Sequence, residues 1–340
     1  MIIRSKAPLR IGLAGGGTDL GNYADRYGGA VLNATISMYA YATIQPRQDG
    51  HIVIHALDRN IVLDTPVSTE LPMKEGLYLH AGVYHRIVKD FVNKPLSFEL
   101  TTLVDAPPGS GLGSSSTLVV AILGAFAEWL KIPLGEYDIA QLAYEIERID
   151  LKMAGGKQDQ YAATFGGVNF MEFYKDNKVI VNPLRINESN LNELSYNLIL
   201  YNTEVSRLSN QIIETQQKNV LEQRISSIQA MHGIREQAFM MKEALLRGEL
   251  EKIGEILDFG WHHKKQMAQG ITNPYLDEIY DTALKAGATG GKISGAGGGG
   301  FMVLYCPGNS RGAVLRALQR FGGQVKRYGF TAKGLTTWSI

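Results

Sequence analysis

A glycine- and serine-rich segment at residues 107–116 carries the clearest chemical signal in the sequence. It reads Pro-Pro-Gly-Ser-Gly-Leu-Gly-Ser-Ser-Ser and is followed at once by an apolar stretch of helical period, residues 117–130. Glycines let the backbone approach an anion closely, and serine hydroxyls and amide groups at a helix N-terminus donate hydrogen bonds to it. The pattern favours a phosphate-binding loop over an ordinary loop with a serine helix cap.

Generic nucleotide-binding motifs do not account for this chain. It contains no Gly-x-x-x-x-Gly-Lys-[Ser/Thr] sequence, so the loop is not a P-loop of that kind. Residues 295–300 satisfy Gly-x-Gly-x-x-Gly, but an apolar, strand-like run follows them and no acidic residue lies downstream for a ribose. The tripeptide Asp-Phe-Gly at 258–260 lies in a helical pattern without the other protein-kinase motifs, so we interpret it as coincidence.

Three glycine-rich segments in order, residues 7–20, 107–116 and 292–300, resemble the motifs of the GHMP kinase superfamily. The resemblance implies an α+β fold, with an N-terminal α/β domain and a ferredoxin-like C-terminal domain that carries added helices. It also implies that ATP is the phosphate donor, that Mg²⁺ assists, and that the middle loop binds the nucleotide. The residues implied for nucleotide binding are Pro108, Gly109, Ser110, Gly111, Leu112, Gly113, Ser114 and Ser116.

The same resemblance implies catalytic and metal-binding residues one by one. Asp159, in the segment Gly-Gly-Lys-Gln-Asp-Gln, matches the catalytic aspartate, and Arg10 of the first motif is expected to stabilise it and the migrating charge. Glu147 and Ser115 match the ligands of Mg²⁺, an ion that prefers oxygen ligands. Alternatives remain for both: Glu145 lies on the same helical stretch, and Ser115 also suits a helix cap.

The first motif, residues 7–20, gives the most information about which molecule accepts the phosphate. Its glycine-rich form, together with residues 155–167, resembles bacterial kinases of D-glycero-D-manno-heptose 7-phosphate. This resemblance implies transfer to the anomeric hydroxyl, which gives the 1,7-bisphosphate. A substrate that already carries phosphate needs a basic subsite, for which Arg207 and Lys264 are candidates, with Lys265 beside it. The residues predicted to bind substrate are Gly16, Gly17, Thr18, Asp19, Arg207, Lys264, Gly297 and Gly298.

Three other functions stay open at the level of sequence. The chain could phosphorylate the anomeric hydroxyl of another sugar, such as fucose, whose kinases also have a glycine-rich first motif. It could be a kinase-like sugar sensor without catalysis, although Asp159, Glu147 and Ser115 are all present. It could also be a decarboxylase of the mevalonate branch, which shares the fold.

Length and composition indicate the number of domains, the kind of partner and the cellular compartment. A length of 340 residues favours two domains, which we place at 1–190 and 191–340 because residues 184–194 are polar. With 34 Lys and Arg against 33 Asp and Glu, bulk charge favours a small-molecule partner over nucleic acid or a membrane. Cys306 is the single cysteine, and charges interrupt the first 13 residues, so we expect a cytoplasmic protein without signal peptide. A monomer or a homodimer is expected.

The elements that must position these residues can be outlined from periodicity. Strands are predicted at 40–45, 51–56, 96–102 and 196–201, where β-branched, aromatic and other apolar residues concentrate. Helices are predicted at 118–130, 139–148, 208–246 and 249–269. The mixture indicates an α+β arrangement rather than strict βαβ alternation.

Overall fold

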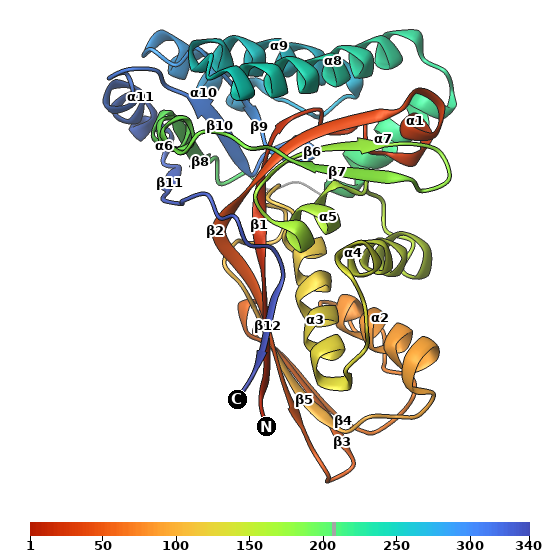
Figure 1. The fold of residues 1–340 in the computed structure, drawn as a ribbon. Helices are drawn as coiled ribbons and strands as arrows, with labels where there is room; N and C mark the ends of the chain where they lie inside the picture. Colours follow the sequence, from red (N-terminus) through yellow and green to blue (C-terminus); the bar gives the residue numbers. More distant parts are fainter. Residues whose placement is uncertain (206–208) are drawn as a thin grey trace.

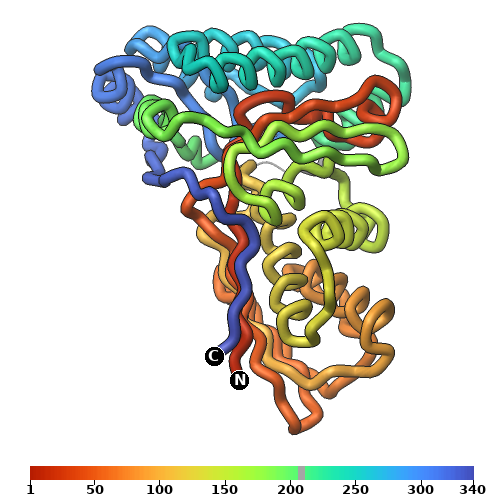
Figure 2. Tube along the Cα trace, in the orientation of Figure 1, coloured from red at the N-terminus to blue at the C-terminus, as the bar shows by residue number. Residues whose placement is uncertain are grey.

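Two β-sheets with helices packed on them form the framework of the chain (Figure 1). The structure is a computed structural model that describes residues 1–205 and 209–340. The strands before residue 184 build the larger sheet, those within residues 198–326 build the smaller sheet, and the chain then returns to the larger sheet with its last strand (Figure 2).

The larger sheet follows the order β12-β1-β2-β5-β3-β4, with β6 paired to the far part of β2 and β7 paired to β6. Its long central strands β1 and β2 run antiparallel, from the Ile3–Ile44 pair to the Ala14–Leu32 pair. Among the described strands of this sheet, only β3 and β5 pair in parallel. The strands are β1 (Ile3–Ala14), β2 (Gly29–Pro46), β3 (His51–Ala56), β4 (Ile61–Pro66), β5 (Phe98–Val104), β6 (Val168–Phe173), β7 (Val179–Pro183) and β12 (Thr336–Ser339).

Helices cover one face of this sheet (Figure 1). The central one, α3, is apolar on nearly all sides, and every residue from Ser116 to Phe126 is buried. Such a helix must lie inside the protein, because no polar face remains for solvent. It packs on β1 and β2 and so carries the phosphate-loop segment at its start to the centre of the domain. The helices of this part are α1 (Gly21–Tyr27), α2 (Tyr78–Ile87), α3 (Ser114–Leu130), α4 (Glu136–Glu145) and α5 (Gln158–Phe165).

The smaller sheet is fully antiparallel, in the order β11-β8-β10-β9. The long helices α8 and α9 lie side by side above it in Figure 1, and α9 packs directly on β9 and β10. The elements are α6 (Glu188–Asn197), β8 (Leu198–Asn202), α7 (Ser209–Leu221), α8 (Ile225–Arg247), α9 (Ile253–Met267), α10 (Pro274–Lys285), β9 (Gly290–Ile293), β10 (Phe301–Tyr305), α11 (Arg311–Leu318) and β11 (Gln324–Lys326).

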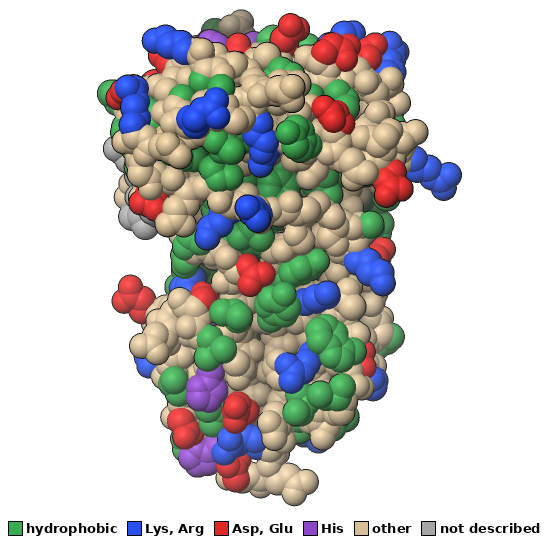
Figure 3. Space-filling model, turned by 90° about the vertical axis from the view of Figure 1, so that its left-hand side faces the viewer, with side chains coloured by type: hydrophobic (Ala, Val, Ile, Leu, Met, Phe, Trp, Pro, Cys, Tyr) green, Lys and Arg blue, Asp and Glu red, His purple; other side chains and the backbone are tan. Residues whose placement is uncertain are grey.

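The last strand returns to the larger sheet. β12 pairs with β1, and Ile2 and Ile340 exchange backbone hydrogen bonds of 2.8 and 2.9 Å, so both ends of the chain share one region of the sheet (Figure 1). The division at residues 190 and 191 stays a prediction. No helix in the described ranges is both long and apolar enough to span a bilayer. On the face in Figure 3, Lys and Arg side chains are interspersed with Asp and Glu over both halves.

The structure corrects several of the predicted elements, among them the strand expected at 96–102, which is Phe98–Val104. The helix expected at 208–246 is two helices, because Gln223 adopts a left-handed conformation (φ 53°) and the amide of Arg224 bonds to the carbonyl of Asn219. The apolar period continues across this turn, so periodicity alone does not reveal it. The strand expected at 196–201 begins two residues later, since Tyr196 and Asn197 end α6. The strand at 51–56 has the predicted bounds.

Candidate active site

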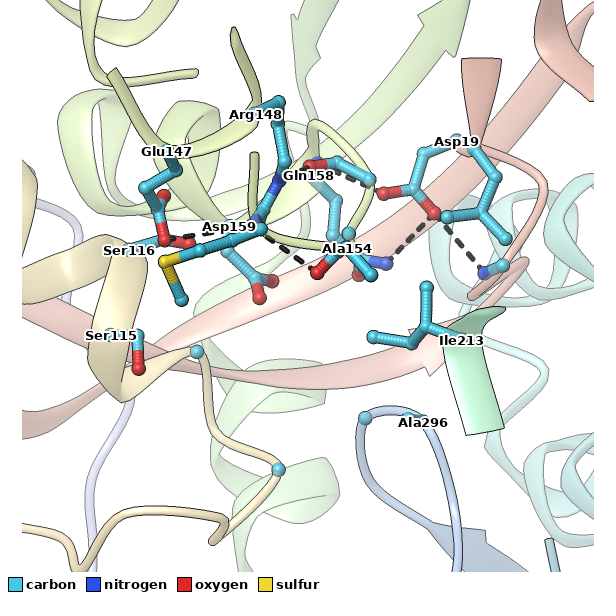
Figure 4. A pocket seen from close by; sticks show the side chains of 18 of the residues that line it. Asp19, Ser115, Ser116, Glu147, Arg148, Ala154, Gln158, Asp159, Ile213 and Ala296 are labelled. Atoms are coloured by element: carbon cyan, nitrogen blue, oxygen red, sulfur yellow. Dashed lines mark hydrogen bonds and ion pairs between the residues drawn. The ribbon is translucent and has the colours of Figure 1, made fainter. Parts of the chain in front are cut away.

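A cavity forms where the three glycine-rich segments meet between the two sheets. Figure 4 shows its walls: the start of α3, the segment from Glu147 to Asp159, and residues from the first and third motifs. The lining includes Arg10, Gly17, Asp19, Gly109, Gly111, Gly113, Ser114, Ser115, Ser116, Glu147, Arg148, Gly156, Gln158, Asp159, Lys264 and Gly295. Residues from near both ends of the chain therefore line the same cavity.

The phosphate loop and the third motif touch through glycines. A Cβ atom on Gly111 would lie 2.3 Å from the carbonyl oxygen of Ser294, and one on Gly295 would lie 2.7 Å from Cα of Gly111. Both glycines also have positive φ, which other residues adopt at a cost. The Ser294 hydroxyl donates to the Gly111 carbonyl at 2.9 Å. The loop is thus fixed to the second sheet, and only glycine fits at either contact.

Asp159 and Arg10 form an ion pair at the centre of the cavity. The Nε and Nη2 atoms of Arg10 both approach Oδ1 of Asp159, at 2.7 and 2.6 Å. Arg10 is almost fully buried and its Nη1 also donates to the Gly111 carbonyl at 2.6 Å. The Asp159 side chain keeps 22% of its surface exposed, and in Figure 4 its carboxylate points into the cavity. The arrangement orients the carboxylate through Oδ1, while Oδ2 has no hydrogen bond to the described residues.

The phosphate loop lies directly against this carboxylate. A Cβ atom on Gly113 would be only 3.1 Å from Cγ of Asp159. Gly113 has φ 80° and precedes α3, whose first residues are Ser114 and Ser115. The amide groups of this first turn have no partner within the helix and carry the positive end of its dipole. An anion held there would sit beside Asp159.

Glu147 is a buried carboxylate with an unsatisfied oxygen. The residue is fully buried in a π-helical turn after α4, and within the described chain its Oε1 has no hydrogen-bond partner, only Arg148 Nη1 at 3.7 Å. Oε2 accepts from Nε2 of Gln160, which also donates to Oγ of Ser116 at 3.1 Å. A buried carboxylate oxygen without a hydrogen bond is costly, so a bound cation fits at Oε1. Glu145, the alternative ligand, instead pairs with Arg86 at 2.9 Å.

The two candidate serines differ in orientation. In Figure 4 the Ser115 hydroxyl points away from Glu147, whereas Ser116 lies beside it. Ser116 is also the serine joined to Glu147 through the Gln160 amide. No group of three or more His, Cys, Asp or Glu in the described chain could hold a metal ion by itself. A cation at Glu147 would therefore depend on hydroxyl, water or phosphate oxygens for its remaining ligands.

Other predicted site residues have structural contacts in place of cavity positions. The Thr18 hydroxyl is buried and bonds to the carbonyls of Gly15 and Ala30, at 2.8 and 2.9 Å. Gly297 packs against Ile271, and the Gly298 amide donates to the Ile271 carbonyl at 2.8 Å. These three residues are not part of the cavity lining as far as the chain is described.

Five further predicted residues lie elsewhere or outside the described ranges. Ser110 is buried and its carbonyl accepts from the Phe301 amide at 3.0 Å, and Gly16 is outside the cavity lining as described. Leu112 is fully buried and contributes its carbonyl, which accepts from the Arg10 amide at 3.1 Å. Pro108 lines a small neighbouring hollow with Ser114 and Ser115. Arg207 falls in the segment 206–208, outside the described residues.

Two buried lysines lie near Arg10. Lys264 on α9 lines the cavity, is 2% exposed and donates to the Gly16 carbonyl at 3.2 Å. Burial lowers the pKa of Lys264 to about 8, with Asp19 raising it and Arg10 lowering it further. Lys292, which opens the third motif, is 4% exposed, and burial together with the charges of Lys264 and Arg10 lowers its pKa well below the ordinary value. Lys292 was not predicted as a site residue, although its place in the motif was visible.

The remaining unpredicted side chains flank Asp159 and Glu147. Gln158 donates to Asp19, Gln160 connects Glu147 to Ser116, and Arg148 donates to the carbonyls of Ala154 and Gly156. Their only sequence signal was adjacency to the predicted catalytic and metal-binding residues. Adjacency does not tell which way a side chain points.

A phosphate loop beside a carboxylate, in a cavity between an α/β half and a smaller antiparallel sheet, defines a kinase that phosphorylates a hydroxyl group. The chain belongs to the GHMP kinase family: residues 79–167 match the GHMP kinases N terminal domain and residues 241–324 the GHMP kinases C terminal model. Members use ATP as donor, and the predicted fold is confirmed.

Relatives with known names or structures match the whole chain. It is 47% identical over 338 residues, 99% of each protein, to D-glycero-alpha-D-manno-heptose 7-phosphate kinase of Campylobacter jejuni. The crystal structure of a D-glycero-D-manno-heptose 1-phosphate kinase from Bacteroides thetaiotaomicron superposes with a TM-score of 0.85 at 43% identity, covering 99% of both chains. A putative sugar kinase from Campylobacter jejuni gives a TM-score of 0.82 at 47% identity, covering 100% of this chain and 98% of the other.

Proposed function

We propose that this chain is a sugar kinase that transfers phosphate from ATP to the anomeric hydroxyl of D-glycero-D-manno-heptose 7-phosphate. The product would be the 1,7-bisphosphate, an intermediate for nucleotide-activated heptose and surface glycans, made in the cytoplasm where ATP is available. The observation that carries the proposal is the position of Asp159, whose carboxylate points into a cavity that the phosphate loop also lines. The full-length relative at 47% identity supports heptose phosphate as the acceptor.

The chemistry assigned to this geometry is a single in-line transfer. The sugar hydroxyl oxygen forms a bond to the γ-phosphorus, the bond from that phosphorus to the β,γ-bridging oxygen breaks, and ADP leaves. Asp159 orients the hydroxyl and takes its proton through Oδ2, while Arg10 holds the carboxylate in place through Oδ1. The amides and hydroxyls at the start of α3 hold the nucleotide phosphates.

Magnesium fits the cavity at Glu147, because Oε1 of this buried carboxylate lacks a hydrogen-bond partner among the described residues. We propose Glu147 as one ligand and Ser115 as another, with Ser116 as the alternative because its hydroxyl is the one linked to Glu147 through Gln160. A bound Mg²⁺ would neutralise charge on the phosphate oxygens. Glu147 lines the cavity, and the Gln160 amide holds its Oε2 in place.

Lys264 is the proposed contact for the phosphate that the sugar already carries. Among the cations that line the cavity, Arg10 is committed to Asp159 and Arg148 to two backbone carbonyls. Among the described residues the Lys264 ammonium has one contact of this kind, to the Gly16 carbonyl at 3.2 Å, and it has three hydrogens to donate. A buried ammonium is poorly solvated, which strengthens its attraction for a phosphate dianion. Gly17, which lines the cavity, would form the adjoining wall for the sugar, and the Gly16 carbonyl holds Lys264 beside it.

The direct test is an ADP-release assay with a panel of acceptors, followed by phosphorus NMR of the product. The panel should contain heptose 7-phosphate, heptose 1-phosphate, free heptose and fucose. We expect turnover of the 7-phosphate and a new anomeric phosphate signal. Turnover of heptose 1-phosphate alone would place the acceptor hydroxyl at the other end of the sugar, and turnover of fucose alone would replace the substrate. Absence of ADP release with every sugar would favour a sensor without catalysis.

A further inference from the structure

The carboxylate of Asp19 is bonded to the N-terminus of α5, the helix that carries Asp159. Its Oδ2 accepts the backbone amides of Lys157 at 3.0 Å and Gln158 at 3.1 Å. Its Oδ1 accepts the Gly17 amide and Nε2 of Gln158, both at 3.1 Å. Figure 4 shows Asp19 turned toward Gln158. Residues 138 positions apart in the chain are joined by these bonds.

These contacts fill the hydrogen-bonding capacity of the side chain. An ionised carboxylate offers about four lone-pair positions, and the described residues supply four donors. Asp19 is 2% exposed, although its edge lines the cavity. A sugar hydroxyl that donates to Asp19 would have to displace one of the protein donors and leave it unpaired in a buried place, which is costly.

The bonds act as a helix cap supplied from a distant segment. The N-cap residue of α5, Lys157, gives its helix no side-chain capping hydrogen bond. The first amides of a helix have no partner inside it, and a negative charge there is favoured by the helix dipole. Asp19 meets both needs, at the turn that contains Asp159.

The glycine before this helix fits the same arrangement. A Cβ atom on Gly156 would lie 1.9 Å from Oδ2 of Asp19, so any side chain there would push the carboxylate out of place. The φ angle of Gly156 is not positive, so the backbone conformation does not require glycine at this position. Its role is to let the carboxylate approach the backbone of α5.

We propose that Asp19 is a positioning residue that fixes the first turn of α5, and with it Asp159, and that it does not bind the sugar. The inference rests on the proposed role of Asp159 as the catalytic carboxylate. It predicts that loss of Asp19 lowers kcat because Asp159 is misplaced, whereas a sugar ligand would chiefly alter KM.

The test compares Asp19→Leu, Asp19→Asn and Gly156→Ala with the wild type in the ADP-release assay. A misplacement of the order of 1 Å lowers rates about a hundredfold, which we expect for Asp19→Leu and Gly156→Ala. Asp19→Asn keeps one carbonyl oxygen for the two backbone amides, so about a tenfold loss is expected, roughly one strong hydrogen bond. Sugar KM should stay within about threefold in all three. A large rise of KM with kcat retained would overturn the proposal.

Hydrogen exchange of the full chain supplies a readout that needs no substrate. Peptides that cover residues 155–165 should exchange faster in Asp19→Asn and in Gly156→Ala, while those covering α3 stay unchanged. Asn187→Ala removes the cap of α6, bonded to the Ser189 amide at 3.0 Å, and serves as the matched control with normal kcat. Unchanged exchange in 155–165 would overturn the capping role even if the enzyme were inactive. If the variants exchange faster but the wild type releases no ADP, the proposed function is rejected and the capping role of Asp19 stands.

Discussion

Arg10 approaches Asp159 with two nitrogens, Nε at 2.7 Å and Nη2 at 2.6 Å, and both meet the same carboxylate oxygen, Oδ1. The third nitrogen, Nη1, is 2.6 Å from the carbonyl of Gly111 in the phosphate loop. A single guanidinium therefore ties the carboxylate to the loop. The fixed fork of arginine makes this possible, since a lysine ammonium is a point charge on a flexible stem.

Arg10→Lys should therefore lower kcat although the charge is retained. We expect a loss of about a hundredfold, because the carboxylate and loop are no longer held at the spacing needed for transfer. The measurement is ADP release at saturating ATP and sugar, with thermal unfolding to confirm that the variant folds. Arg4→Lys, on the exposed face of the same strand, is the matched control and should behave as wild type. A fully active Arg10→Lys would contradict the tie between carboxylate and loop.

Glu147→Gln should weaken the dependence on magnesium. The amide retains the shape but loses the charge that the unsatisfied Oε1 offers to a cation. Removing one carboxylate ligand should raise the Mg²⁺ concentration for half-maximal activity by at least about tenfold, or about 1.4 kcal/mol. Glu145→Gln is the control, because Glu145 pairs with Arg86 outside the cavity. Equal dependence of activity on Mg²⁺ in wild type and Glu147→Gln would show that Glu147 is not a ligand of the metal.

The serine assignment can be decided with the same titration. Ser115→Ala and Ser116→Ala remove one hydroxyl each from the first turn of α3. If Ser115 is the ligand, it must turn toward Glu147 when the nucleotide binds, and its loss should shift the Mg²⁺ curve. If Ser116 is the ligand, only Ser116→Ala should shift the curve. The family motif assigns Ser115, whereas the structure favours Ser116 through its link to Gln160. The titration therefore decides between these two assignments.

The affinity for a phosphorylated sugar should fall as pH rises through the pKa of Lys264. Burial lowers this pKa to about 8, so the ammonium is charged below pH 8 and loses its proton above it. Since the charged form binds phosphate, KM should increase between about pH 7.5 and pH 9. Lys264→Met should show high KM at every pH, while Lys265→Met, altered one residue along the same helix, keeps the wild-type profile. A pH-independent KM in wild type would exclude Lys264 as the phosphate contact.

Local patterns predicted those features whose geometry is set within a short segment. The phosphate loop, the apolar helix after it and the short strand at 51–56 follow from residues close in sequence. The hydrogen bonds of Asp19 to Lys157 and Gln158 do not, because these partners lie 138 and 139 positions away and backbone amides leave no trace in residue type. That Asp19 binds the sugar stays a prediction, and the cap of α5 is the role that we propose from its contacts. The return of β12 to β1 also depends on pairing between chain ends.

The sequence also does not predict the direction in which a side chain points. Ser114, Ser115 and Ser116 are consecutive and equivalent by type, yet only tertiary contacts tell that Ser116 faces Gln160. Likewise Lys264 and Lys265 are adjacent, but one is 2% exposed in the cavity and the other pairs with Asp277 at 3.7 Å. Helical spacing separates neighbours by about 100°, and the direction of the core must be known before either can be assigned.

Lys292 provides a prediction about stability. It is buried beside Lys264 and Arg10, and burial with these charges lowers its folded pKa well below that of the unfolded chain. The unfolded chain then binds more protons between the two pKa values, so this residue destabilises the fold most at low pH and progressively less as pH rises toward 10.5. Lys292→Met removes a buried charge, and replacement by an apolar residue of similar length should stabilise the fold by about 1 kcal/mol.

Urea unfolding at pH 6 and pH 9 measures this effect. The gain of Lys292→Met over wild type should be larger at pH 6, because the wild-type penalty is greater there. Lys326→Met, on the short strand β11 away from the cavity, is the control and should change the free energy of unfolding equally at both pH values. A destabilised Lys292→Met at pH 6 would mean that the ammonium is satisfied by contacts that outweigh its burial, and the charge would then be stabilising in the folded protein.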